Sequence, residues 1–183
     1  GCGTSTGLGA VFNIAEVQYG SRVAIIGAGG IGLNVLMGCL VAGAEEIVVV
    51  DPNPERRKLA LDFGATAVVE SNEEALREYA PSGYEYVFES AGFTAPMELA
   101  LKVTERGGTC TLIGAPDPSA VITIPALDFV PSQRRLLGCL TGNARPNPDF
   151  ARSFPPFAPC RLPLASLVPP TLHVPEFPPA PPL

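Results

Sequence analysis

The stretch from residue 23 to residue 51 constrains the fold of this chain more than any other. It reads VAIIGAGGIGLNVLMGCLVAGAEEIVVVD. A β-branched run precedes a glycine-rich turn, an apolar helical pattern follows the turn, and a second β-branched run ends at Asp51. Short apolar runs of this composition are typical of strands buried in a parallel sheet. The stretch therefore predicts a strand–turn–helix–strand unit with a carboxylate at its end.

The glycine turn has the spacing that binding of a dinucleotide requires. Gly27, Gly29 and Gly32 form a G-x-G-x-x-G pattern. The first glycine permits a tight turn, the second lets the backbone approach a pyrophosphate, and the third lets helix and strand pack closely. The pyrophosphate would lie on N–H groups at the positive end of the following helix. An ordinary strand-to-helix turn is the alternative interpretation.

The carboxylate of Asp51 stands where it could accept hydrogen bonds from the hydroxyl groups of the adenosine ribose. A 2′-phosphate would be repelled there, so we expect NAD rather than NADP. Arg56 and Arg57 follow closely in the sequence and weaken that preference. A simple strand-end carboxylate is the alternative for Asp51.

Strand and helix patterns alternate along most of the chain. A first helical pattern lies within residues 1–19, with Thr4 or Ser5 as its candidate N-cap and Gly20 as its end. The expected strands are residues 23–26, 47–50, 67–69, 84–89, 109–114 and 136–140, and the expected later helices include residues 54–63, 73–79 and 96–103. This alternation predicts an α/β Rossmann fold with a doubly wound, six-stranded parallel sheet, whose ligand lies at the carboxyl ends of the strands.

The composition changes near residue 143. Most of the 21 prolines lie beyond it, and proline removes backbone donors and blocks helices. We therefore expect an NAD-binding Rossmann domain over residues 1–143 and a proline-rich, irregular tail over residues 144–183. A proline-rich ligand for a partner domain is the alternative for the tail.

Charge and cysteine content limit the partners and the compartment. The net charge of −6 and the pI near 4.8 argue against a nucleic-acid partner, and no apolar run is long enough to predict a membrane span. The five cysteines are odd in number and widely spaced. They favour a reducing, cytoplasmic location, with Cys39 and Cys110 as buried hydrophobic residues.

Several segments resemble the zinc-dependent medium-chain alcohol dehydrogenases, in order from Gly1 to about Pro148. They are GCGTSTGLGA, GAGGIGLNVL, VVVDPNPERRKLALDFGA, YVFESAG, GGTCTLIGAP and ITIPALDF. The opening segment is the most specific of them, because many relatives lack its cysteine. The resemblance implies hydride transfer between an alcohol or aldehyde and NAD, with a zinc ion that activates the alcohol.

The resemblance also implies that part of the enzyme is missing. Cys2 matches one protein ligand of the catalytic zinc, and the other ligands and the proton-relay groups match sequence upstream of residue 1. We therefore expect a fragment that contains no catalytic residue and holds zinc only if those ligands are supplied. A truncated NAD(H)-binding module without turnover is the alternative function.

The resemblance assigns further cofactor contacts. Thr6 would pack beside the nicotinamide and Ile31 behind it, and Arg56 would support the adenosine ribose unless it is simply a solvated helix charge. Backbone groups around three later residues would hold the carboxamide. The full set of expected cofactor residues is Thr6, Gly27, Gly29, Gly30, Ile31, Gly32, Asp51, Arg56, Ile113, Cys139 and Thr141.

Residues 121–124 and Glu89 are expected to have roles other than those in the set above. Residues Val121–Ile124 are similar to an edge strand that pairs with its twin in a homodimer. Glu89, at the end of the fourth expected strand, should face the cofactor crevice or cap the following turn rather than act in catalysis.

Overall fold

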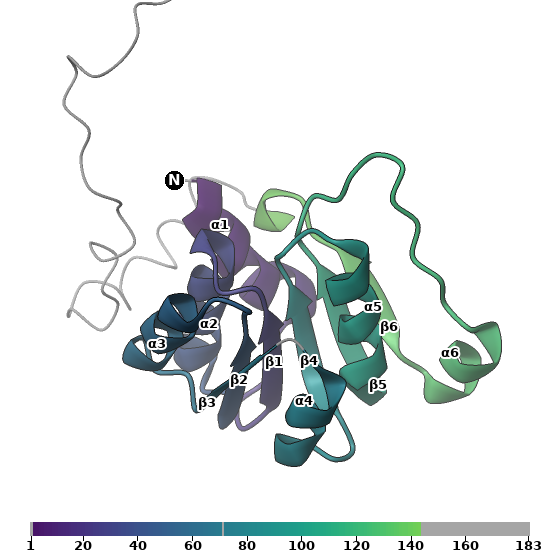
Figure 1. Cartoon of the computed structure of the whole chain (residues 1–183), viewed down its shortest axis with the longest axis horizontal. Helices are drawn as coiled ribbons and strands as arrows, with labels where there is room; N and C mark the ends of the chain where they lie inside the picture. Colours follow the sequence, from purple (N-terminus) through teal and green to yellow (C-terminus); the bar gives the residue numbers. More distant parts are fainter. Residues whose placement is uncertain (1, 71, 144–183) are drawn as a thin grey trace, which may run out of the picture.

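Six parallel strands form a single sheet at the centre of the molecule (Figure 1). The computed structural model describes residues 2–70 and 72–143, and the predicted proline-rich tail lies outside them. The strands are β1 (Arg22–Ile26), β2 (Glu46–Val50), β3 (Ala67–Val69), β4 (Tyr84–Glu89), β5 (Thr104–Leu112) and β6 (Arg135–Gly138). Their order is β3-β2-β1-β4-β5-β6, so the chain begins at the centre and winds outward twice. This order confirms the predicted Rossmann fold.

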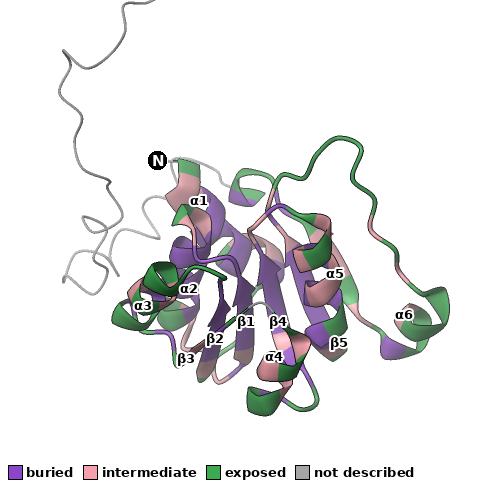
Figure 2. Cartoon of the chain, in the orientation of Figure 1, coloured by how far each residue is buried: buried purple, intermediate pink, exposed green. Residues whose placement is uncertain are grey.

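Helices cover both faces of the sheet. They are α1 (Cys2–Gly9), the π-helical η1 (Ala10–Ala15), α2 (Gly30–Ala42), α3 (Pro54–Asp62), α4 (Glu73–Tyr79), α5 (Thr94–Val103), α6 (Ala126–Ser132) and the short 3₁₀ turn η2 (Thr141–Asn143). Figure 2 shows the central strands buried and the outer helix surfaces exposed. Among the helices that the structure describes, none has the length and apolar character to cross a membrane.

The sheet is buried because alternate residues of its central strands enter two separate cores. Val23 and Ile25 of β1 pack with α2 and η1, whereas Ala24 and Ile26 pack with α4 and α5 on the opposite face. All four are buried. A strand with both faces covered is apolar throughout, which explains the continuous runs in β1 and β2.

The glycines of the opening segment permit close packing of α1. A Cβ at Gly7 would lie 2.5 Å from the Cβ of Asn34 on α2, and a Cβ at Gly9 would overlap the carbonyl of Gly142. Helix α1 therefore lies directly against both α2 and η2, and these two positions exclude larger side chains.

The start and end of the first helix differ from the prediction. Helix α1 already begins at Cys2, so Thr4 and Ser5 lie inside it and neither is its N-cap. The Ser5 hydroxyl instead donates to the carbonyl of Cys2 at 3.1 Å. The helical segment ends at Ala15, before a left-handed residue at Glu16, rather than at Gly20. Packing on α2 stabilises this glycine-rich helix where local propensity does not.

Strand β5 begins five residues earlier than predicted. Tyr84 of β4 pairs with Thr104, whereas Tyr86 pairs with Thr109, so residues 105–108 bulge from the ladder. Gly107 has a φ of 76° within that bulge. Gly107 and Gly108 therefore lie inside an interrupted strand rather than before its start.

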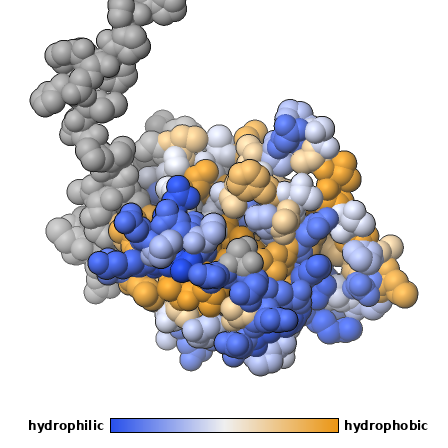
Figure 3. Space-filling model, in the orientation of Figure 1, coloured by the Kyte–Doolittle hydropathy of each residue, from blue (hydrophilic) through white to orange (hydrophobic). Residues whose placement is uncertain are grey.

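The region before β6 also differs from the expectation. Helix α6 was not predicted, and it contains Pro131 near its end. The expected edge strand, Val121–Ile124, has no strand structure in the described chain. Ile122 and Ile124 pack against the core, whereas Val121 is 76% exposed. Figure 3 shows hydrophobic surface over α6 and the preceding loop.

Candidate functional site

The glycine turn lies at the carboxyl end of β1, where it is held by close backbone contacts. Gly27 has a φ of 102°, and a Cβ at Gly32 would overlap the carbonyl of Gly27. The Ser90 hydroxyl, at the end of β4, donates to that same carbonyl at 3.0 Å. In contrast, Gly29 and Gly30 face open space, since a Cβ at either position would have no neighbouring atom within 4 Å. The turn thus combines a packed inner side with an open outer side.

The open side of the turn coincides with the start of α2. Gly29 is the N-cap residue and makes no side-chain cap, and no acidic residue lies in the first turn. The first N–H groups of a helix lack partners within the helix and carry the positive end of its dipole. Because Gly29 and Gly30 leave space beside these groups, the site fits a pyrophosphate.

The Asp51 carboxylate is hydrogen-bonded to the glycine turn. It is 3% exposed, and its Oδ2 accepts a hydrogen bond from the Ala28 N–H at 2.9 Å. Its Oδ1 accepts from the Asn53 N–H at 2.8 Å. An ionised carboxylate has about four acceptor positions, so each oxygen can still accept from a ribose hydroxyl. The bond to Ala28 sets the carboxylate beside the glycine turn.

The two arginines after Asp51 have different surroundings. Nη1 of Arg57 donates to the carbonyl of Asp51 at 2.7 Å, and its Nη2 lies 3.2 Å from Oε1 of Glu70. Nη1 of Arg56 lies 3.8 Å from Oδ2 of Asp51, and its side chain is 58% exposed. Arg56 is therefore the arginine beside the carboxylate, whereas Arg57 supports the strand-end backbone.

Glu89 lies fully buried at the end of β4. Its Oε1 accepts hydrogen bonds from the N–H groups of Ala91 and Gly92, each at 2.7 Å. Its Oε2 has no hydrogen-bond partner among the described residues. Burial raises the pKa of the carboxyl group, and the backbone donors oppose that shift. Glu89 therefore caps its following turn, which was one of the two expected roles.

Backbone hydrogen bonds hold the carboxyl ends of β5 and β6 beside the carboxyl end of β4. The Ile113 N–H donates to the carbonyl of Glu89 at 2.8 Å, and the Cys139 N–H donates to the carbonyl of Leu112 at 2.8 Å. Both Ile113 and Cys139 are buried, and burial raises the pKa of the Cys139 thiol. The three strand ends thus form one continuous wall beside the glycine turn.

Three consecutive left-handed residues follow β6. The φ values of Thr141, Gly142 and Asn143 are 52°, 70° and 47°. This conformation costs about 1–2 kcal/mol for each of the two residues that carry a Cβ. Such a turn persists only where its surroundings hold it. Here the amide of Asn13, on η1, donates to the Gly142 carbonyl at 3.2 Å.

Helix α1 carries Cys2 and Thr6 to this edge. The carbonyl of Thr6 lies against Gly142, and its buried hydroxyl is 3.8 Å from the Sγ of Cys2, which is exposed. No group of three metal-binding His, Cys, Asp or Glu side chains occurs within the described residues. A zinc site needs three or four protein ligands, so Cys2 and its described neighbours do not fit zinc by themselves.

The structure thus brings the predicted residues of α1, the glycine turn and the three strand ends to one edge of the sheet. Sequence reasoning missed Ser90 and Asn13. The Ser-Ala-Gly turn after the fourth strand was a signal for Ser90. Asn13 had none, because its partner lies 129 residues away.

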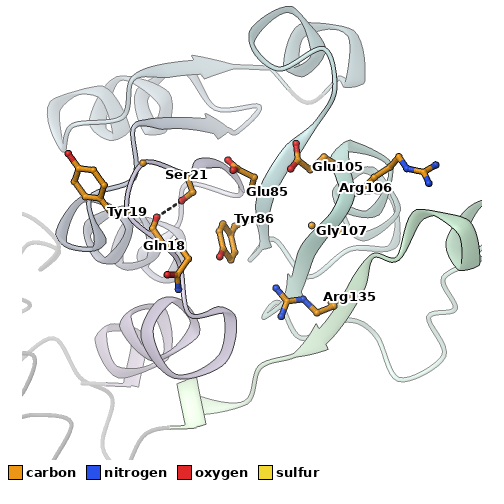
Figure 4. A pocket seen from close by; sticks show the side chains of 11 residues that line it. Gln18, Tyr19, Ser21, Glu85, Tyr86, Glu105, Arg106, Gly107 and Arg135 are labelled. Atoms are coloured by element: carbon orange, nitrogen blue, oxygen red, sulfur yellow. Dashed lines mark hydrogen bonds between the residues drawn. The ribbon is translucent and has the colours of Figure 1, made fainter.

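A pocket of about 290 Å³ lies at the opposite edge of the sheet (Figure 4). It is lined by residues near the beginnings of β1, β4 and β6 and by the bulge of β5, and Tyr86, Glu105 and Arg135 are among them. Arg22, nearby, pairs with Glu105 at 2.8 Å. Ligands of open parallel sheets bind outside the carboxyl ends of the strands. This pocket is therefore separate from the glycine turn.

Comparison with known proteins identifies the family. A family model described as "Zinc-binding dehydrogenase" matches residues 30–155. Geraniol dehydrogenase from Castellaniella defragrans is 33% identical over 80% of this chain and 40% of its own length. Alcohol dehydrogenase class-3 from Myxine glutinosa is 40% identical over 62% of this chain and 32% of its own length. The chain therefore spans less than half of these relatives.

Solved structures agree with this comparison. An alcohol dehydrogenase zinc-binding domain protein from Burkholderia ambifaria aligns with a TM-score of 0.87 and 31% identity, over 91% of this chain and 46% of that protein. A protein described as a zinc-binding dehydrogenase from Sinorhizobium meliloti 1021, solved with NADP, aligns with a TM-score of 0.72 and 26% identity, over 76% of this chain and 43% of that protein. The chain belongs to the zinc-dependent medium-chain alcohol dehydrogenase family.

Proposed function

We propose that this chain binds NAD at the carboxyl edge of its sheet, as the cofactor domain of an alcohol dehydrogenase. The observation that carries the proposal is the 2.9 Å hydrogen bond between Asp51 and the N–H of Ala28. This bond joins the acid at the end of β2 to the open glycine turn at the end of β1. One rigid unit thereby offers N–H groups to a pyrophosphate and a carboxylate to a ribose.

The proposed cofactor would extend across both halves of the sheet. The adenosine end would lie over β2, near Asp51, and the nicotinamide end over β4, β5 and β6, because dinucleotides cross the crevice where the strand order reverses. Thr6, Ile31, Ile113, Cys139 and Thr141 are the proposed contacts of the nicotinamide half.

We favour NAD over NADP on the charge of Asp51. Its buried carboxylate would repel a 2′-phosphate. Arg56, whose Nη1 is 3.8 Å from that carboxylate, offers partial compensation. The Sinorhizobium relative was solved with NADP, so the comparison leaves both cofactors within the family's range.

The proposed reaction is hydride transfer between an alcohol and the nicotinamide of NAD. When bound, NAD supplies the hydride acceptor. The residues of this chain bind the cofactor and orient it, and no catalytic residue is assigned to them. The described residues do not fit zinc by themselves, so a catalytic zinc would need ligands besides Cys2. The named relatives act on alcohols, and an alcohol or aldehyde is the proposed substrate class.

An NAD(H)-binding module without turnover is the second candidate. It is favoured by the exposed position of Cys2, which belongs to no group of three metal-binding side chains within the described part of the chain. Measurements on the 183-residue chain separate the two candidate functions. Both candidate functions require a saturable fluorescence change with NADH. The enzyme also requires alcohol-dependent NADH formation and stoichiometric zinc, whereas the module has neither. Absence of any response at millimolar NADH would refute both.

We also propose that a second copy of the chain covers the surface around Val121. Residues 121–124 alternate between exposed and partly buried positions, as an edge strand does, but have no strand partner within the described residues. Val121, Leu127 and Val130 are all more than 70% exposed. Pairing of two such segments would add backbone hydrogen bonds between them and cover these side chains.

For the compartment, we propose the cytoplasm. Cys39, Cys110 and Cys139 are buried free thiols in the described structure. Burial raises the pKa of Cys110 to about 12 and that of Cys39 above its ordinary range, so both remain protonated. Unpaired thiols of this kind are typical of a reducing compartment.

A further inference from the structure

The left-handed turn η2 is held in place from a distant part of the chain. Its central carbonyl, that of Gly142, accepts a hydrogen bond from Nδ2 of Asn13 at 3.2 Å. Asn13 belongs to the π-helix η1, and its side chain is partly buried. Figure 1 shows η2 beside α1 and η1, although the two segments are at opposite ends of the described chain.

Close packing against α1 also restricts the position of η2. A Cβ at Gly142 would overlap the Ser5 carbonyl and would lie 2.9 Å from both the Thr6 carbonyl oxygen and the Cα of Gly9. These close approaches are steric contacts, and the Asn13 amide adds one directional hydrogen bond to them. A π-helical turn changes the direction of its side chains relative to an α-helix and is frequent at functional sites.

The position of η2 relates this bond to the cofactor. The turn follows β6, and the dinucleotide is proposed to place its nicotinamide end over the carboxyl ends of β4, β5 and β6. Thr141, the residue before Gly142, is exposed at this edge. A shift of the Gly142 carbonyl would therefore move the backbone of Thr141 at the nicotinamide end and leave Asp51 at the adenosine end unchanged.

We propose that Asn13 is a positioning residue for the nicotinamide half of the cofactor. Its amide fixes the left-handed turn Thr141–Asn143, which in turn presents backbone groups to the carboxamide. The inference rests on the proposed binding of NAD. Loss of the Asn13 amide should weaken only the binding of the nicotinamide half, because other elements make the proposed adenosine and pyrophosphate contacts at the glycine turn.

The test compares two ligands that differ in the nicotinamide. Calorimetry measures the Kd of NADH and of ADP-ribose for the 183-residue chain and for Asn13→Asp. This variant keeps the side-chain shape and removes the amide donor. NADH is used because its dihydronicotinamide is uncharged. We expect the Kd of NADH to rise about three- to tenfold, as for the loss of one hydrogen bond, and that of ADP-ribose to change less than about twofold by the same scale.

Gln18→Glu is the matched control. The amide of Gln18 also donates to a backbone carbonyl, that of Glu16, at 2.6 Å, but it lines the pocket at the opposite edge of the sheet. This control should change neither Kd. If Asn13→Asp does not fold, Asn13→Ala removes the donor without adding a charge and should give the same selective loss.

The outcomes distinguish the inference from the proposed function. If the wild-type chain binds neither ligand, both fail. If it binds both ligands with equal Kd, the nicotinamide is not held and the inference alone fails. Equal weakening of both ligands by the Asn13 variants would indicate a general structural role, and no weakening would indicate no role; either result overturns the inference while NAD binding stands.

Discussion

Substitution of Asp51 by asparagine separates its structural role from its proposed role in binding. The carboxylate accepts the N–H groups of Ala28 and Asn53 at 2.9 and 2.8 Å, and the residue is 3% exposed. An amide of the same shape has only one acceptor oxygen. One of the two backbone N–H groups would therefore face an NH₂ group in place of its acceptor.

The cost follows from the bonds that are lost. A hydrogen bond to a charged group contributes about 1.5–3 kcal/mol, so the free energy of unfolding of Asp51→Asn should fall by about that amount in urea. The loss of a charge-assisted bond to the ribose would weaken NADH by a similar energy, or about 10- to 150-fold in Kd. NADPH should be weakened less, because the repulsion of its 2′-phosphate is removed.

The same substitution at Asp62 is the control for Asp51→Asn. Asp62 is exposed at the end of α3, so Asp62→Asn should change stability by less than about 0.5 kcal/mol and should not change the Kd of NADH. Unchanged stability of Asp51→Asn would refute the inferred hydrogen bonds. Reduced stability with an unchanged Kd for NADH would refute the contact with the ribose and leave Asp51 as a structural residue.

Three other predictions concern packing, pH and assembly. Gly32→Ala should lower the free energy of unfolding by about 3 kcal/mol or more, since its Cβ overlaps a backbone carbonyl, whereas Gly30→Ala should not lower it; equal effects would contradict the packing. Burial raises the pKa of Glu89, so the contribution of this residue to the free energy of unfolding falls as pH rises from about 4.5. Glu89→Gln removes this contribution, so the free energies of unfolding of variant and wild type should diverge by at most about 1.4 kcal/mol per pH unit; a constant difference between them across pH would contradict the prediction. Sedimentation should give a dimer that Leu127→Asp dissociates; a monomeric wild-type chain would contradict the proposed interface.

The sequence predicted the central fold because its signals were local. The β-branched runs of β1 and β2 and the glycine spacing between them each reflect contacts within one βαβ unit. The acid at residue 51 belongs to the same unit. The glycine turn and Asp51 lie together at the carboxyl end of the sheet, where the adenosine and pyrophosphate half of the cofactor is proposed to bind.

The parts that sequence reasoning missed depend on distant contacts. Gly7 and Gly9 of helix α1 pack against α2 and η2, which no local pattern reveals. The bond from Asn13 to Gly142 joins the two ends of the described chain. Residues 121–124 were expected as a strand, but an edge strand needs a partner. Long-range packing therefore decides the structure of the edge where the nicotinamide is proposed to bind.

The most direct test of the central claim is the location of the cofactor on the chain. In a ¹⁵N-labelled sample, addition of NADH should shift the amide signals of Gly29, Gly30 and residues 141–143, at the carboxyl edge of the sheet. The signals of Gly107 and Arg135, which line the pocket at the opposite edge, should not move. Shifts confined to Gly107 and Arg135, or none at millimolar NADH, would contradict the assignment of the glycine turn as the cofactor site.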